Sequence, residues 1–440
     1  MIPALLAFLI ASFYIIKSPG GLGADAFDYD TLAHSILTGH YNLNGGPSML
    51  REPGYPMFRA ILIFLGAHLM TILWIQAIMY AGTVFLVGLS AEKIDPRLGI
   101  WGAWGAALSY GLAFYPSTHL SENLTAFLAA LIGFFFITAL DNPRLRNWVL
   151  VALSGAALIY TRYAFSFIPL LCLVSLYIVS LKKGISKKEV IKKELISIVI
   201  IIAAVSPWIL RNYEQFGEPN MAGLSGTIAY ARAWKAEQSW WALGDSYISV
   251  FIGRGLLFTI YPTNQSIFQE QWGSWQRDPA QIKLWGSTDE QIDKARRKAA
   301  LAIIFKNPNQ FAKFALWTGV DDLRLFELPS PIIKAKGSPF EGTYGPLAKT
   351  TGLSLIQIIA LAAVHIVQLI WWIALIASII LGFKKYRWRF VPGIFFIALI
   401  IPFSAVDNIP RFAVPLHPWF LAGVFLTVIP LIVNKFCLSK

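Results

Sequence analysis

Long apolar runs recur along the whole sequence, and they constrain the fold more than any other feature. A run of about 18 apolar residues is long enough for a helix to cross a bilayer. Only helices and closed barrels satisfy their backbone groups there. The 440 residues are 56% hydrophobic and 14% charged, whereas soluble domains are about 25% charged. The sequence therefore predicts an all-α polytopic membrane protein.

The apolar runs predict about ten spans, because each is long enough to form a membrane-crossing helix. The first is residues 2–17, for which a cleavable signal peptide is the alternative. No Lys or Arg precedes this run, and the alternation of loops across the membrane requires it, so we retain it as a span. The other spans are expected near residues 68–90, 98–116, 122–140, 147–162, 164–181, 195–210, 358–382, 390–405 and 414–433.

The basic residues set the expected orientation. The chain has 37 Lys and Arg against 24 Asp and Glu, a net charge of +13. These basic residues gather in every second loop, and all of these loops lie on the same face of the membrane. The positive-inside bias makes that face cytoplasmic. Both termini are then cytoplasmic in a multi-pass protein of the cell membrane. The positive charge is therefore explained without nucleic acid as a partner. The two Cys predict neither a disulfide framework nor a Cys-x-x-Cys metal site.

Three regions follow from this topology. Residues 1–213 are expected to form an N-terminal transmembrane module, with a first external loop at 18–56. Residues 214–351 are expected to form a small, mainly helical extracytoplasmic domain, and residues 352–440 the C-terminal transmembrane helices. In the external domain, a capping-box pattern predicts a helix from Ser287 to about Phe305. Another is expected near Asn309, whereas 220–280 is expected to be loop with little regular structure.

The first external loop carries three aspartates, Asp25, Asp28 and Asp30. From Asp25 onward, apolar residues recur at helical spacing up to Gly39, which predicts a short amphipathic helix in the interface plane. On such a helix Asp28 and Asp30 point to different sides. We interpret both as solvated carboxylates, with Asp28 able to orient Asp25. Pro53 and Pro56 are expected to break the chain before the next span.

Charged groups are concentrated on the external face, and the interiors of the spans are almost uncharged. A coupled transporter is expected to bury ionisable groups near the midplane instead. The pattern therefore favours chemistry at the outer water–lipid boundary. The external polar residues are Asp25, Asp28, Asp30, Arg51, Glu52, His119, Glu122, Arg162, Tyr163, Arg211, Asp407 and Arg411.

An enzyme on this face needs an activated substrate that arrives in lipid form, because ATP is absent there and the sequence has no P-loop. Arginine forks match phosphate oxygens, and a carboxylate can take a proton from an acceptor hydroxyl. The residue types on the external face therefore suit a lipid-linked phosphate donor.

Several motifs resemble those of GT-C glycosyltransferases, in particular the protein O-mannosyltransferase-like and aminoarabinose-transferase-like bacterial branch (glycosyltransferase family 39-like). The resemblance covers most of the chain, and the order of the motifs carries more weight than any single one. The motifs are DAFDYDTLAHSI with REPGYP, LSENL, GAALIYTRYAFSFIP, SPWILRNYEQFG, FKNPNQFAKF and RFAVPLHPWF.

The resemblance implies a GT-C-like bundle with interfacial helices in the first external loop. It also implies inverting transfer of a sugar, hexosyl or pentosyl, from a polyprenyl-phosphate donor on the extracytoplasmic face. Asp25 matches the catalytic acidic position and would be the general base, and helix capping is the alternative role for it. Glu122 matches a second acidic position near the site, and Asp28, close to Asp25 in the sequence, is the other candidate helper. The residues that would meet the donor phosphate or substrate are Arg51, Tyr55, Arg162, Arg211 and Arg411.

The acceptor is left open by the resemblance. Ala26 follows Asp25 where protein mannosyltransferases have Glu, which favours an envelope glycan or glycolipid, such as O-antigen or lipopolysaccharide, over protein. A lipid-linked saccharide transporter or flippase and a polymer ligase are the alternative functions. No cofactor is firmly implied. For a divalent metal, His119 and Glu122 are the candidate ligands, and a capping arrangement of the two is the alternative.

Overall fold

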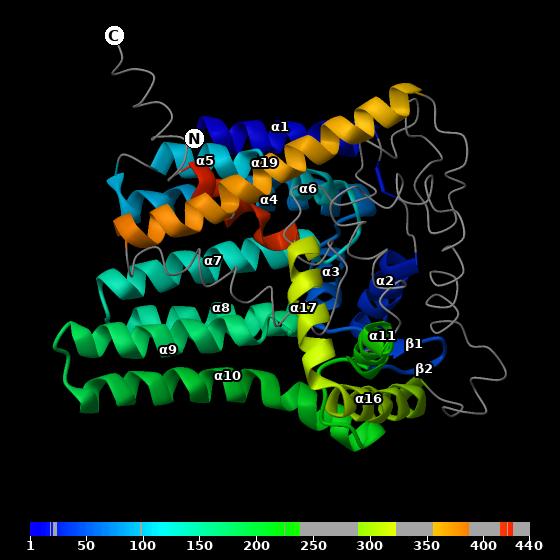
Figure 1. The fold of residues 1–440 in the computed structure, drawn as a ribbon. Helices are drawn as coiled ribbons and strands as arrows, with labels where there is room; N and C mark the ends of the chain where they lie inside the picture. Colours follow the sequence, from blue (N-terminus) through cyan, green and yellow to red (C-terminus); the bar gives the residue numbers. More distant parts are fainter. Residues whose placement is uncertain are drawn as a thin grey trace, which may run out of the picture. The chain divides into compact units, whose positions relative to one another are not determined.

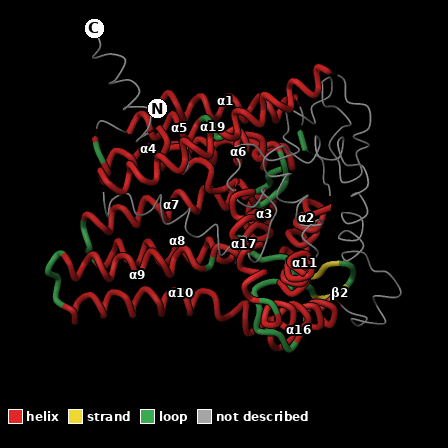
Figure 2. Tube along the Cα trace, viewed as in Figure 1, coloured by secondary structure: helices red, strands yellow, loops and turns green. Residues whose placement is uncertain are grey.

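A computed structural model describes residues 1–17, 19–20, 24–96, 99–223, 225–237, 289–322, 355–386, 414–419 and 421–425. Within these ranges almost all regular structure is helical, and Figure 2 shows strands only in one short hairpin. This confirms the prediction of a mainly helical protein. The predicted span at 390–405 lies outside the described residues.

The chain divides into two compact units. The first contains Met1–Ala222, Leu375–Phe396 and Val414–Lys440. The second contains Gly223–Ala374 and Ile397–Ala413. The long helix α19, Leu355–Tyr386, contributes to both units, and it confirms the helix predicted at 358–382.

The first unit is a bundle of long helices. Within it, α7 packs on α8, and α8 packs on both α9 and α10, as Figure 1 shows. Among the described residues, four helical segments are long and apolar enough to cross a membrane. They are Leu69–Ile94 (α4), Glu122–Asp141 (α7), Tyr163–Lys182, which ends with α9 (Phe167–Lys182), and Lys187–Phe216 (α10). The apolar helices α1 (Ile2–Lys17) and α8 (Leu145–Thr161) are shorter.

The span predicted at 98–116 is interrupted. The structure has α5 at Gly99–Ala107, α6 at Tyr110–Phe114 and a 3-10 turn at Tyr115–Ser117 (η2). A buried helix break leaves carbonyl groups without helical partners. The Tyr80 hydroxyl meets this need by donating to the carbonyls of Ala107 and Ser109, over 3.0 and 3.3 Å. Because Tyr80 is distant in sequence, the break was not predicted.

Helix α3, Gly54–Phe64, replaces the predicted break before the second span. Pro53 is the residue before the helix, and Pro56 lies in its first turn. Proline is tolerated there because the first amide groups of a helix have no intrahelical partner. Gly54 is needed for a different reason: a Cβ at this position would lie 2.7 Å from backbone atoms of Tyr160 and Thr161 in α8.

The basic segment before the seventh predicted span is mostly helical instead of a loop. Helix α10 begins at Lys187, and the Ser186 hydroxyl caps it by accepting from the Glu189 amide over 3.3 Å. It ends at Phe216, and the next residue, Gly217, adopts φ 70°, the left-handed conformation that glycine allows at a helix end. This long helix carries its C-terminal turns to the same end of the bundle as α3.

The second unit contains α11 (Ser225–Glu237), α16 (Asp289–Lys306) and α17 (Pro308–Asp322). The last two confirm the helices predicted from Ser287 and near Asn309. Helix α11 corrects the expectation of loop for the first part of 220–280. Its first turn is capped by Asp293 of α16, whose carboxylate accepts from the amides of Gly226 and Thr227 over 3.0 and 2.8 Å. A cap supplied from α16 has no local signal in the sequence.

Candidate functional site

Helix α2, Ala24–Leu37, carries the three aspartates at one end of the bundle (Figure 1). The loops after α7 and α9 lie at the opposite end. The helix forms where predicted because its apolar residues recur on one face: Tyr29, Leu32 and Ala33 are buried, each with at most 5% of its surface exposed. Asp25 lies in the first turn, where a negative charge is favourable beside the free amide groups.

Arg51 joins Asp25 and Asp28. Its Nη2 lies 2.5 Å from Asp25 Oδ1 and 2.8 Å from Asp28 Oδ2, and its Nε donates to the same Asp28 oxygen over 3.1 Å. Its guanidinium also lies over the Tyr29 ring, 5.6 Å from the centroid. Burial lowers the pKa of Arg51, but Tyr29 and the two carboxylates outweigh this, so the net pKa lies above its ordinary value. Arg51 therefore stays charged.

Asp30 forms a second ion pair, on another side of α2. It accepts from Nη2 of Arg59, which is fully buried within α3. This corrects the interpretation of Asp30 as a solvated carboxylate. A buried guanidinium is costly unless a negative charge accompanies it, and Asp30 supplies that charge. The interpretation of Asp28 as a solvated carboxylate is also corrected, because Asp28 forms an ion pair with Arg51.

His119 completes this second group. Its Nδ1 lies 2.9 Å from Nη1 of Arg59. A guanidinium can only donate, so the geometry assigns Nδ1 as the acceptor and places the ring proton on Nε2. Burial, and then the charge of Arg59, lower the pKa of His119 to about 4, against an opposing effect of Asp30. His119 is therefore neutral at pH 7.

Glu122 and Arg162 meet beside α2. Arg162, at the end of α8, lies 3.6 Å from Glu122 Oε1 and donates to the Ser121 hydroxyl over 2.9 Å. That hydroxyl in turn lies 3.4 Å from the hydroxyl of Tyr29 on α2. Burial raises the pKa of Tyr29, so its phenol is neutral and available as a hydrogen-bond partner. The structure thus connects two predicted site residues to α2 through Ser121.

Tyr55 is buried against α2 and does not reach the surface. It is fully buried, and its hydroxyl donates to Gln76 Oε1 over 3.0 Å. Its ring packs against Tyr29 in an edge-to-face arrangement with centroids 5.0 Å apart. Through this contact with Tyr29, Tyr55 packs against the buried face of α2.

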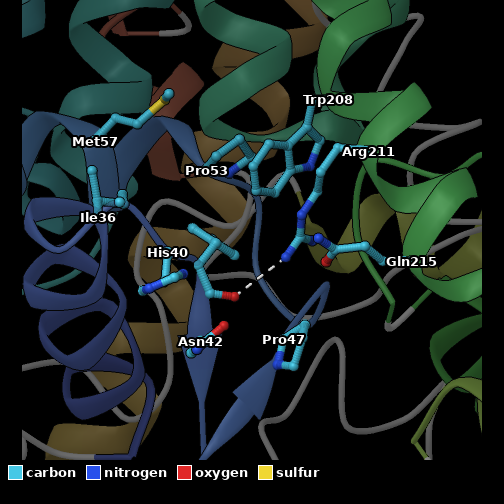
Figure 3. A pocket seen from close by; sticks show the side chains of 11 residues that line it. Ile36, His40, Asn42, Pro47, Pro53, Met57, Trp208, Arg211 and Gln215 are labelled. Atoms are coloured by element: carbon cyan, nitrogen blue, oxygen red, sulfur yellow. Dashed lines mark hydrogen bonds between the residues drawn. The ribbon is translucent and has the colours of Figure 1, made fainter.

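Arg211 lies apart from the aspartates, near the end of α10. Its Nη1 donates to the Ser48 carbonyl over 2.7 Å and to Asn212 Oδ1 over 2.8 Å. Its Nη2 donates to the Tyr41 carbonyl over 3.3 Å, the bond drawn in Figure 3. Its guanidinium also lies 5.0 Å from the centre of the Trp208 ring. These contacts attach α10 to the hairpin of β1 (Asn42–Leu43) and β2 (Gly46–Pro47).

The candidate metal ligands have different partners. His119 contacts Arg59, whereas Glu122 contacts Arg162. In the part of the chain that the structure describes, no group of three or more His, Cys, Asp and Glu is placed to hold a metal ion. The predicted site residue Arg411 lies outside the described residues.

The two ion pairs of α2 differ in access. The Asp25 side chain is 26% exposed and that of Arg51 is 16% exposed, whereas that of Arg59 is fully buried. A substrate can therefore reach the first pair, where a carboxylate can accept a proton and a guanidinium can bind an oxyanion. In the second pair the guanidinium is inaccessible, and the Asp30 carboxylate, 19% exposed, joins it to α2. Arg59 was missed by sequence reasoning, although a charged residue within the apolar run of α3 is a usable signal.

Comparison with known proteins gives a likeness of fold. No protein-family model matches the chain, and neither does any curated protein. Among solved structures, the archaeal oligosaccharyltransferase AglB from Archaeoglobus fulgidus, in complex with an inhibitory peptide and a dolichol-phosphate, matches with a TM-score of 0.50 and 13% identity. The match covers 99% of this chain and 51% of AglB. The chain has the GT-C fold.

Two structures of ArnT, an aminoarabinose transferase from Cupriavidus metallidurans, are also similar. The one bound to undecaprenyl phosphate has a TM-score of 0.41 and 10% identity, over 97% of this chain and 76% of ArnT. The apo structure has a TM-score of 0.39 and 11% identity, over 99% and 78%. The likeness to AglB is the one that shows the GT-C fold, and this chain spans about half of the length of AglB.

Proposed function

We propose that this GT-C protein is an integral-membrane glycosyltransferase. It would move a hexosyl or pentosyl group from a polyprenyl-phosphate donor to an acceptor hydroxyl, with inversion, on the extracytoplasmic face of the cell membrane. The observation that carries the proposal is the reachable Asp25–Arg51 pair, in which a carboxylate and a guanidinium lie 2.5 Å apart. The complex of AglB with a dolichol-phosphate supports a lipid phosphate as the donor class.

The two residues have complementary roles in this reaction. Asp25 accepts the proton of the acceptor hydroxyl while the oxygen of that hydroxyl forms a bond to the anomeric carbon. The bond from that carbon to the phosphate oxygen breaks, and the polyprenyl phosphate leaves with the added negative charge. Arg51 stabilises this charge through its donors. Because the phosphate competes for Nη2 of Arg51, donor binding also releases the Asp25 oxygen that this nitrogen holds.

The neighbouring groups would act through these two residues. Asp28 keeps Arg51 in place through Nε while Nη2 exchanges partners. Arg162 and Glu122 hold Ser121 against Tyr29, and thereby set the position of α2. For the acceptor, we favour an envelope glycan or glycolipid, such as O-antigen or lipopolysaccharide, over protein. Both termini would be cytoplasmic.

Transfer from a defined donor tests the proposal. The purified protein is placed in lipid nanodiscs with a radiolabelled polyprenyl-phosphate hexose or pentose and a mixture of envelope glycolipids. Asp25→Asn is expected to lower the transfer rate about 10²–10⁴-fold, because it removes the base. Arg51→Lys is expected to lower the transfer rate about 10²–10³-fold, because lysine lacks the forked guanidinium donors that stabilise the leaving phosphate. Asp141→Asn, the same chemical change at the opposite end of the bundle, is the matched control.

Two results would contradict the proposal. If Asp25→Asn transfers sugar at the rate of the Asp141→Asn control, Asp25 is not the base. If the wild-type protein leaves every donor intact but carries it across the bilayer of sealed vesicles, the protein is a transporter of lipid-linked saccharides.

A further inference from the structure

A hollow lies between the hairpin, the start of α3 and the end of α10. It has a volume of about 500 Å³, within the roughly 300–1,000 Å³ range of small-molecule sites. Figure 3 shows its lining side chains arranged around the space, with Trp208, Arg211 and Gln215 from α10 and His40 and Asn42 from the segment after α2. Pro53 and Met57 close it on the side of α3.

Apart from Arg211, the lining consists of apolar, aromatic and polar side chains. Trp208, Tyr41 and Pro47 bring rings to the lining, and His40, Asn42 and Gln215 bring hydrogen-bond donors and acceptors. Flat rings suit the C–H face of a sugar, and planar amide and imidazole groups suit its hydroxyls. No carboxylate is among the lining side chains, so the hollow offers no ion-pair partner to a basic ligand.

Arg211 does not make the hollow a phosphate site. Its two terminal nitrogens bind the carbonyls of Ser48 and Tyr41 and the side chain of Asn212. Its guanidinium is also surrounded by three aromatic rings, with centroids at 5.0–5.5 Å. A phosphate would have to displace these partners at a place that has no second cation among the lining residues. The ligand that fits is uncharged.

Tyr41 connects the hollow to the candidate catalytic pair. It is one of the lining residues, and its hydroxyl donates to the Arg51 carbonyl over 3.0 Å and to that of Glu52 over 3.3 Å. Pro53, the next residue, lines the hollow itself. The segment 51–53 therefore contacts Asp25 through the Arg51 side chain and lines the hollow through Pro53.

We propose that this hollow, lined by His40, Tyr41, Asn42, Trp208 and Gln215, is a subsite for an uncharged saccharide unit of a substrate. This inference rests on the proposed function for its substrate class. The sugar would stack on the flat rings, and its hydroxyls would bond to the imidazole and the two amides. It belongs either to the acceptor glycan or to the donor sugar, and kinetics separate the two sources.

The first experiment measures binding without turnover. Saturation-transfer NMR is recorded on the full chain in nanodiscs with methyl glycosides of glucose, galactose, mannose and N-acetylglucosamine. Wild type is expected to transfer saturation to the C–H protons of at least one glycoside. The double variant His40→Ala/Gln215→Ala is expected to lose at least half of this signal. Tyr213→Ala is the control, because Tyr213 is 58% exposed on the same helix and does not line the hollow.

The second experiment assigns the source of the sugar. With a polyprenyl-phosphate sugar and a glycolipid acceptor, the double variant is expected to raise the KM of one substrate about tenfold, because two hydrogen bonds are lost, and to leave kcat unchanged. A higher KM for the acceptor assigns the hollow to the acceptor, and a higher KM for the donor assigns it to the donor sugar.

The proposal is overturned if the double variant keeps the full glycoside signal, or if inorganic phosphate binds there and displaces the glycosides. The proposed function can fail separately. If the wild-type protein binds glycosides but transfers no sugar, the subsite is supported and the glycosyltransferase function is contradicted.

Discussion

Arg59 Nη1 donates to Nδ1 of His119 over 2.9 Å, although the two residues are 60 positions apart. This bond joins α3 to the turn that precedes α7, and it requires a neutral imidazole. Protonation of Nδ1 would remove the acceptor and place a second positive charge against a buried guanidinium. His119 therefore makes the stability of this end of the bundle sensitive to pH.

We expect the folded protein to lose stability between about pH 6.5 and 4. The pKa of His119 is lowered from 6.5 to about 4 by burial and by Arg59. Above pH 6.5 the imidazole is neutral in both states. As the pH falls below 6.5, the unfolded chain binds a proton that the folded chain does not, so stability falls until about pH 4. Thermal unfolding in detergent micelles, compared with His119→Gln, should show the steeper loss in wild type. Equal slopes would exclude His119 as the cause.

Asp30→Asn should destabilise the protein by about 2–3 kcal/mol, because it leaves the charge of Arg59 buried without a carboxylate. Wholly buried pairs lose roughly 3–5 kcal/mol, and the 19% exposure of the Asp30 side chain reduces the effect. The double variant Asp30→Asn/Arg59→Gln should be more stable than the sum of the single changes predicts. Denaturant titration of the four proteins measures this. Strict additivity would show that the pair does not interact in the folded state.

Gly54→Ala should separate α3 from α8. Its Cβ would lie 2.7 Å from backbone atoms of Tyr160 and Thr161, which cannot move as a side chain could. We expect a loss of about 1–3 kcal/mol, as for other overpacked sites, and a fall in any activity that depends on Arg51. Gly46→Ala is the matched control, because no heavy atom lies within 4 Å of a Cβ there. If the two alanine variants have the same unfolding midpoint, the close approach of α3 and α8 is wrong.

Arg211→Lys should loosen the hairpin and leave the bundle intact. A lysine is a point charge and cannot bridge the carbonyls of Ser48 and Tyr41 as the arginine fork does. Hydrogen–deuterium exchange should increase in residues 41–48 and stay unchanged in α7 and α8. Arg146→Lys, an exposed change at the opposite end of the bundle, is the control. Donor-phosphate binding that weakens while residues 41–48 stay protected would instead support the phosphate role expected of Arg211.

Much of the fold was predictable because it follows from local patterns. The apolar runs predicted α4 and α7, and the spacing of Tyr29, Leu32 and Ala33 predicted α2 with its buried face. The capping box before Ile292 predicted α16. The elements that were mispredicted depend on distant partners instead. The break at Ala107–Ser109 uses the hydroxyl of Tyr80.

The sequence by itself determined a helical membrane protein whose first polar loop forms a helix with Asp25 in its first turn. Helical periodicity and apolar length are properties of neighbouring residues, so they can be read along the chain. Only the tertiary structure decided the partners of the charges: Arg51 for Asp25 and Asp28, and the buried Arg59 for Asp30. The physical reason is that a charge removed from water requires a counterion close in space, and folding alone determines which distant residue that is.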